Sequence, residues 1–280
     1  MILNITDPKI LQSLERKLRH SPPFSSDELE TLEILTFKYG RGDFEVLQYC
    51  TNIMLLSLSG SEVTDLSWWP ASNAMYRADI AFCPVTDLTP LLRCPALEGL
   101  DGGDTLVEDI SLLFEFECLR GGNLVGMPLS DESYHEHLPR LLTWKAPKAR
   151  KVVDFAYSPE EEWQMSRELR RRGLRAVYSH AQPGRQMVIA PGLVATRCPD
   201  LYSWELTPDE LRAVLDEQDW DTTSFMTRCG EVHEQKYLPP GLIAQLAKER
   251  AMEAEAQAEA QAQAEAQAQA QSTNAETKSE

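Results

Sequence analysis

The tetrapeptide Val63-Thr64-Asp65-Leu66 returns as Val85-Thr86-Asp87-Leu88 and again as Val107-Glu108-Asp109-Ile110, and each copy starts 22 residues after the last. A fainter copy, Leu129-Ser130-Asp131, follows at the same interval. Separate apolar positions keep this period too, as in the set Ile53, Met75, Leu97 and Leu119. Self-similarity at a short fixed period indicates a stack of repeated units. The period therefore predicts a repeat architecture for this part of the chain.

Nearest-neighbour burial is the physical basis of such a stack. One unit of this length cannot bury its own apolar side chains, but stacking places Ile53, Met75, Leu97 and Leu119 in one continuous column. Strands about 4.8 Å apart then pair as a parallel sheet. The ends of the stack need caps, and a helix predicted over Pro8–Leu18 precedes a capping box formed by Ser25 and Glu28. We therefore expect a helical N-terminal cap.

The residues of the repeat also carry a family resemblance. The unit that spans residues 47–66, together with Asp87-Leu88-Thr89-Pro90-Leu91, resembles the 22-residue leucine-rich repeats of the internalin-like bacterial family. The resemblance covers roughly residues 25–131 and implies a short strand at each L-x-L, a tight turn after it and a protein-binding surface. The chain departs from the family pattern after each strand, where the usual asparagine is replaced by Ser61, Cys83, Thr105 and Met127.

These patterns predict an α/β chain with four segments. Residues 1–46 form the helical N-terminal cap, 47–139 a short leucine-rich repeat solenoid, 140–240 a small α/β domain, and 241–280 an Ala/Glu/Gln-rich helix that ends in a disordered tail. The small α/β domain either continues the sheet of the solenoid or packs on its end. In the third segment we expect strands over 152–157, 174–178 and 186–190, with a turn at Pro183-Gly184. Helices are expected to begin after Ser158 and Thr207, each closed by a capping box.

Charge and composition limit the class of partner. Of the 280 residues, 27 are Lys or Arg and 44 are Asp or Glu, which gives a net charge of −17. Residues 1–139 carry 9 basic and 22 acidic side chains, whereas residues 140–185 carry 11 and 5. Nucleic-acid binding depends on clusters of Lys and Arg, so the acidic repeat region argues against it. A basic protein partner is favoured, because opposite charges speed its approach.

The same composition predicts a cytoplasmic protein with no membrane partner. No apolar run approaches the roughly 20 residues that cross a bilayer, and residues 1–19 lack the apolar core of a secretion signal. The six cysteines have no close C-x-x-C pairing and are interpreted as reduced thiols.

No cofactor or metal is predicted. The repeated aspartates could suggest calcium, but calcium loops need several oxygen ligands within one loop; we expect Asp65, Asp87, Asp109 and Asp131 to cap turns instead. His135 and His137 form the only close histidine pair, and spacing indicates no third ligand. The arginines at 167, 170, 171, 172 and 175 gather at the end of a predicted helix, where cations are favourable.

Strand alternation identifies the residues that face a partner. The predicted partner-binding residues on the concave repeat face are Leu55, Ser57, Ser59, Arg77, Asp79, Ala81, Asp101, Asn123 and Val125. Three glycines share this face with them: Gly99, Gly103 and Gly121. We therefore expect a non-enzymatic protein-binding module, in its sharper form a toxin-neutralising immunity protein. The alternative is an enzyme housed in residues 150–240, which would require a pocket that gathers His180, His233 and an acidic residue.

Overall fold

The computed structural model describes residues 1–182, 185–193, 203–237 and 248. The chain divides into two compact units, Met1–Gly230 and Glu231–Glu280. The predicted Ala/Glu/Gln-rich tail lies outside the described residues apart from Lys248, and so does the predicted turn at residues 183–184. The mixed α/β class expected from the sequence is confirmed.

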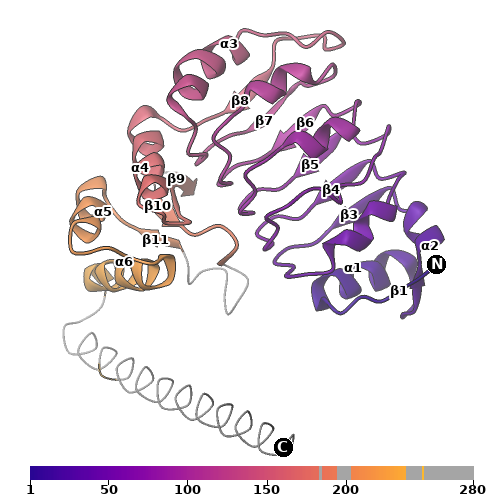
Figure 1. Cartoon of the computed structure of the whole chain (residues 1–280), viewed down its shortest axis with the longest axis horizontal. Coiled ribbons are helices and arrows are strands. Elements are labelled where there is room, and N and C mark those ends of the chain that lie inside the picture. The colour runs from indigo at the N-terminus through magenta and orange to yellow at the C-terminus, as the bar shows by residue number, and fades with distance from the viewer. Residues whose placement is uncertain (183–184, 194–202, 238–247, 249–280) are drawn as a thin grey trace, which may run out of the picture. The chain divides into compact units, whose positions relative to one another are not determined.

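A parallel sheet of six short strands runs through the first unit, and its strands lie in sequence order (Figure 1). The strands are β3 (Ile34–Thr36), β4 (Leu55–Ser57), β5 (Arg77–Asp79), β6 (Gly99–Asp101), β7 (Gly121–Asn123) and β8 (Asp154–Ala156). Leu55 pairs with Arg77, Arg77 with Gly99 and Gly99 with Gly121, so the register advances by the 22-residue period. The final step, from Gly121 to Asp154, is longer, and the sheet thus continues past the segment boundary predicted after residue 139.

The repeated apolar positions form the core behind this sheet. Ile53, Met75, Leu97 and Leu119 are all completely buried, and the central strand residues Leu56, Ala78 and Leu100 are buried beside them. Burying one such leucine contributes about 1.5–3 kcal/mol relative to leaving it exposed. Because each unit shields its neighbours, this gain depends on the stack as a whole.

Short helical turns connect the strands on the core side of the units. They are η1 (Phe44–Tyr49), η2 (Thr89–Arg93), η3 (Ser111–Glu115), η4 (Ser133–His137) and α3 (Leu138–Leu141). Three repeated aspartates cap these connections as predicted: Asp65, Asp87 and Asp109 each accept a hydrogen bond at 2.8 Å from the backbone N–H two residues later. The fourth, Asp131, departs from the pattern and binds the guanidinium of Arg167 instead.

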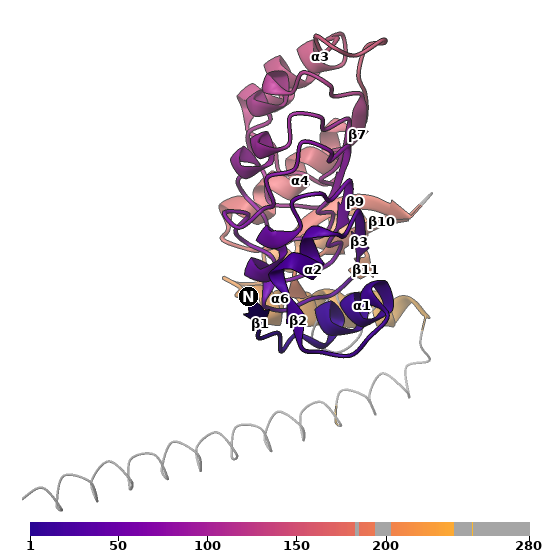
Figure 2. The same cartoon turned by 90° about the vertical axis from the view of Figure 1, so that its right-hand side faces the viewer.

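The N-terminal region lies next to β3, the first strand of the sheet. It consists of β1 (Ile2–Leu3), α1 (Pro8–Leu18), β2 (Phe24–Ser25) and α2 (Ser26–Glu30). The predicted helix over Pro8–Leu18 is confirmed, and the predicted capping box of Ser25 and Glu28 is present. Helix α1 lies beside β3 (Figures 1 and 2), where Ser13 Oγ donates a hydrogen bond to the Thr36 carbonyl at 2.9 Å. That contact occupies a backbone acceptor of the first strand.

A second, antiparallel sheet follows β8 in the order β11-β10-β9. The elements of this region are α4 (Glu160–Arg171), β9 (Val177–Gln182), β10 (Arg185–Ile189), β11 (Ser203–Glu205), α5 (Pro208–Leu215) and α6 (Thr222–Tyr237). The predicted capping box of Thr207 and Glu210 is present. The one predicted at Ser158 is not, because Ser158 Oγ accepts the N–H of Gly126 at 2.7 Å and α4 begins without a side-chain cap.

Two glycines in the same register column give a matched test of the sheet. Gly121 has a φ of 151°, and a Cβ there would lie 1.9 Å from the Asp154 carbonyl oxygen, whereas a Cβ at Gly99 would meet nothing closer than 3.9 Å. We expect Gly121→Ala to lower the free energy of unfolding by about 1–3 kcal/mol or more, and Gly99→Ala to change it by no more than about 0.5 kcal/mol. Urea unfolding followed by circular dichroism measures both. Equal stability of the two variants would contradict this register.

Candidate functional site

The predicted partner-binding residues lie along the outward side of strands β4 to β7, which we call the strand face. Leu55 and Ser57 belong to β4, Arg77 and Asp79 to β5, Asp101 to β6 and Asn123 to β7. Ser59, Ala81 and Val125 each follow two residues after a strand ends. Exposure varies within the set: Arg77 is exposed, whereas Ser57 and Ala81 keep only 9% and 4% of their surface. The last two residues therefore offer a partner little surface.

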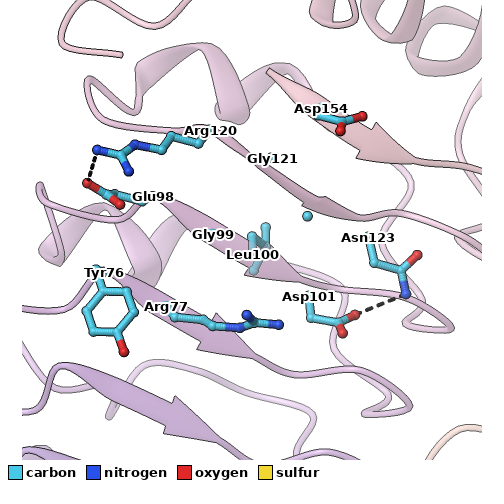
Figure 3. Close-up of a pocket in the computed structure, with 11 residues that line it drawn as sticks. Tyr76, Arg77, Glu98, Gly99, Leu100, Asp101, Arg120, Gly121, Asn123 and Asp154 are labelled. Atoms are coloured by element: carbon cyan, nitrogen blue, oxygen red, sulfur yellow. Dashed lines mark hydrogen bonds and ion pairs between the residues drawn. The ribbon is translucent and has the colours of Figure 1, made fainter. Parts of the chain in front are cut away.

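A concavity of about 480 Å³ lies on this strand face (Figure 3). Three glycines, Gly99, Gly121 and Gly122, line it without contributing side chains. Arg77 extends across β6 toward Asp101, and Asp101 holds Asn123 beside it (Figure 3). The Glu98–Arg120 ion pair, at 2.7 Å, lies on the opposite side of the concavity. A segment of another protein could thus contact the glycine backbone of the concavity, between charged side chains of both signs.

Sequence reasoning found only part of this lining. Of the twelve residues predicted on this face, five line the concavity and seven do not; the five are Arg77, Gly99, Asp101, Gly121 and Asn123. The prediction missed five lining residues that have side chains: Tyr76, Glu98, Leu100, Arg120 and Asp154. A signal for three of them was present, since Tyr76, Glu98 and Arg120 follow one another at 22 residues. They stand just before each strand, a position that strand alternation alone does not examine.

The third residues of strands β5, β6 and β7 form a column of hydrogen-bonded side chains. Asp79, Asp101 and Asn123 each accept the backbone N–H two residues later, at 3.1, 3.3 and 3.0 Å. Asp and Asn suit this position because their short side chains satisfy the N–H groups of a turn. Lateral bonds join the column, from Ser57 Oγ to Asp79 at 2.7 Å and from Asn123 Nδ2 to Asp101 at 3.1 Å.

One carboxylate of this column, that of Asp101, has a raised pKa. Burial, followed by the charge of Asp79 on the neighbouring strand, raises the pKa of Asp101, and Arg77 partly offsets both effects. Both oxygens of Asp79 accept hydrogen bonds. Among the described residues no donor reaches the second oxygen of Asp101. The strand face thus contains a half-buried pair of like charges, with one carboxylate oxygen available to an incoming cation.

A separate buried carboxyl, Asp104, joins the second sheet to the repeats. Ser179 on β9 donates a hydrogen bond to its Oδ1 at 2.6 Å. Burial raises the pKa of Asp104 to about 7, and the charges of Asp101 and Glu162 act in the same direction. Glu162 on α4 is itself 1% exposed and pairs with His180. Asp104 follows β6, Glu162 lies on α4, and Ser179 and His180 lie on β9. Their contacts form the junction, which we call the joint, between the repeats and the second sheet.

One contact that the enzyme alternative requires is present. His180 and an acidic residue, Glu162, do come together. Neither residue lines the concavity on the strand face. His233 belongs to the other compact unit. The hydrogen bonds of Ser179 and Gln186 to Asp104 and Glu162 hold the second sheet in place, which is a structural role.

Other candidate groups have structural partners as well. Within the described residues no cluster of three or more His, Cys, Asp or Glu side chains could hold a metal ion. His135 and His137 lie on the turn η4, where His137 is 3.7 Å from both Asp109 and Glu132. Three of the clustered arginines form ion pairs, Arg167 with Asp131, Arg170 with Glu108 and Arg172 with Glu168. Cys50, Cys83, Cys94 and Cys229 are buried free thiols, whose pKa burial raises.

Comparison with known proteins gives distant structural likeness only. No family model matches the sequence, and no curated protein matches it. An internalin from Listeria monocytogenes (InlF) is similar in structure with a TM-score of 0.42 and 16% identity, over 57% of this chain and 53% of that chain. Internalin C2 from the same organism gives 0.37 and 18%, over 57% and 79%. The chain therefore spans about half the length of the first of these structures.

A third solved structure is similar over a smaller part of the chain. The CBM51-2 and INT domains of ZmpB from Clostridium perfringens give a TM-score of 0.25 at 18% identity, over 39% of this chain and 19% of that chain. Among the described helices none has the length and apolar content that spanning a bilayer requires.

The joint at Asp104 predicts a specific pH dependence of stability. The folded-state pKa of about 7 lies above the ordinary carboxyl value, so the folded state binds the extra proton and stability rises as pH falls from about 7 toward about 4. Asp104→Asn keeps the acceptor for Ser179 and removes the titration. We expect the difference in unfolding free energy, wild type minus variant, to change by up to about 1.4 kcal/mol per pH unit in that window. Denaturant titrations at several pH values measure it, and a pH-independent difference would contradict the buried-carboxyl assignment.

Proposed function

We propose that this chain is a protein-binding module, and that its six-stranded stack is a short leucine-rich repeat solenoid of the internalin-like type. The observation that supports this function best is the glycine-lined concavity on the strand face. Tyr76, 38% exposed, and the exposed Arg77 stand at its margin. Tyrosine and arginine are the residue types that most often anchor protein interfaces.

The partner contributes a basic side chain to this site. Asp79 and Asp101 lie on adjacent strands in register, and burial together with the charge of Asp79 disfavours ionisation of Asp101. A lysine or arginine of the partner, placed over Asp101, would relieve that repulsion and use the available carboxylate oxygen. The acidic excess of residues 1–139, 22 against 9, would speed the approach of such a partner.

A toxin-neutralising role in the cytoplasm is the sharper form of this proposal. Basic toxin domains would match the charge of the strand face, and the buried free thiols suit a reducing compartment. The test is inhibition: excess protein should abolish the activity of a co-purifying basic toxin domain. Unchanged toxin activity at saturating protein would rule out neutralisation and leave the binding module to be tested separately.

The strand-face site predicts a charge-specific loss of binding. Asp101→Asn removes one of the three carboxylates that line the concavity, whereas Asp219→Asn makes the same charge change at an exposed position outside it. We expect Asp101→Asn to weaken a partner that co-purifies with the wild type by about tenfold, about 1.4 kcal/mol, and Asp219→Asn to leave the affinity unchanged. Titration calorimetry on the co-purified partner measures both.

The pH dependence of that binding has a defined sign. The cation binds the ionised carboxylate, and the pKa of Asp101 is raised. The affinity for the partner should therefore be highest above that pKa and should decline on acidification. The decline should start at a higher pH than it would for an exposed aspartate. Asp101→Asn should lack this component. Equal effects of the two asparagine variants, or affinity that increases on acidification, would argue against the site.

A further inference from the structure

A second concavity, of about 430 Å³, lies between α1 and the end of β3, and we call it the α1 groove. Figures 1 and 2 show α1 beside β3 at this end of the sheet. Lys9, Gln12, Ser13 and Arg16 line it from the helix, and Lys38 and Tyr39 line it from the segment after β3. Ser57 of β4 also borders it.

Helical spacing collects the polar residues of α1 on one side. Positions 9, 12, 13 and 16 recur at intervals of three and four, so their side chains share a face of the helix. Ile10 and Leu14 are completely buried on the core side. Ser13 is also buried and binds the Thr36 carbonyl, which fixes the helix against β3. Lys9, Arg16 and Lys38 are exposed.

The lining contains three cations and no carboxylate. In the part of the chain that the structure describes, none of the three cations forms an ion pair. The aspartates nearest in sequence, Asp7 and Asp43, direct their carboxylates at backbone N–H groups: Asp7 caps α1, and Asp43 accepts the N–H of Asp7 at 2.6 Å. This concentration of positive charge stands within residues 1–139, where acidic side chains outnumber basic ones by 22 to 9.

Helix stability explains only part of this arrangement, since Arg16 lies in the last turn of α1, where a cation is favourable, but Lys9 does not. Cations stabilise the last turn of a helix and are unfavourable in the first turn, because of the helix dipole. Lys9 lies in the first turn of α1, which contains no acidic residue. Three cations gathered around one concavity also repel one another, so that an anion placed between them lowers the electrostatic energy. Arg16 donates long hydrogen bonds, both 3.5 Å, to Ser13 Oγ and the Thr36 carbonyl, which are neutral acceptors. A carboxylate or phosphate group would add the negative charge that Lys9, Arg16 and Lys38 lack.

We infer that the α1 groove binds an acidic segment of a protein. The groove is open and larger than a single small anion needs, and its cations come from two elements, so consecutive Glu or Asp side chains can each reach one. This site is separate from the concavity of the strand face, because the two linings share no residue. It goes beyond the proposed function and holds or fails independently of the Asp101 site.

Binding of a short poly-glutamate peptide to the full-length chain tests the inference. The triple variant Lys9→Gln, Arg16→Gln, Lys38→Gln removes the cations of the groove. The matched control Lys17→Gln, Lys145→Gln, Arg175→Gln removes three exposed cations elsewhere and has the same net charge. We expect salt-sensitive binding to the wild type and to the control, and affinity reduced about tenfold or more in the groove variant. Circular dichroism confirms that both variants are folded.

Three outcomes would overturn the inference. Absence of peptide binding to the wild type would do so, as would equal weakening in both triple variants, which would indicate a response to net charge alone. Binding of inorganic phosphate in the groove without binding of the peptide would assign the site to a small free anion instead. Competition between phosphate and the peptide, lost together in the groove variant, supports the shared oxyanion chemistry of an acidic protein segment.

Discussion

Each turn of the stack stays folded only because its neighbours cover its apolar side chains. Ile53, Met75, Leu97 and Leu119 are completely buried, although a single unit has too few residues to enclose any of them. The backbone follows the same rule, since strands β4 to β7 pair residue by residue at the 22-residue interval. Sequence period, parallel register and buried column are therefore three consequences of one constraint.

This constraint leaves the strand face available for binding. In strands β4, β5 and β6 the central side chain is buried in the core, as Leu56, Ala78 and Leu100 are, whereas the centre of β7 is Gly122, which has no side chain. The flanking positions are free to be charged, polar or glycine, and the chain uses that freedom at Arg77, Gly99 and Asp101. The second sheet contacts the turns after the strands, where Ser179 binds Asp104 and the Gly192 N–H binds the Phe82 carbonyl. Stability and the proposed binding site thus depend on different positions of the same repeat.

Much of the fold follows from local patterns in the sequence. The helix over Pro8–Leu18 and the capping boxes at Ser25 and Thr207 depend on residues close together in the chain, and the structure reproduces them. Strand β8 joins the sheet after a longer interval than the period, so the repeat pattern, which fades after Asp131, could not show that it belongs there. Ser158 has the sequence of a helix cap, but a tertiary contact with Gly126 takes its side chain.

The candidate site was less accessible to prediction. Alternation selected Arg77, Asp101 and Asn123, which line the concavity, whereas Tyr76, Glu98 and Arg120 precede their strands and were not selected. The α1 groove combines a helix face with residues after β3, and only folding brings these together. The burial of Asp104 likewise depends on β9, because its hydrogen-bond partner Ser179 lies on that strand, 75 residues further along the chain. A periodic pattern in the sequence does not predict such long-range contacts.

Hydrogen exchange in a Leu97→Ala variant tests the shared column most directly. Leu97 is completely buried between the neighbouring units, while Leu92 in the same repeat is 39% exposed and serves as the control. If neighbouring units stabilise one another, Leu97→Ala should reduce the protection of backbone amides in β5, β6 and β7 together, and Leu92→Ala should not. Loss of protection confined to β6, with its neighbours unaffected, would contradict the account.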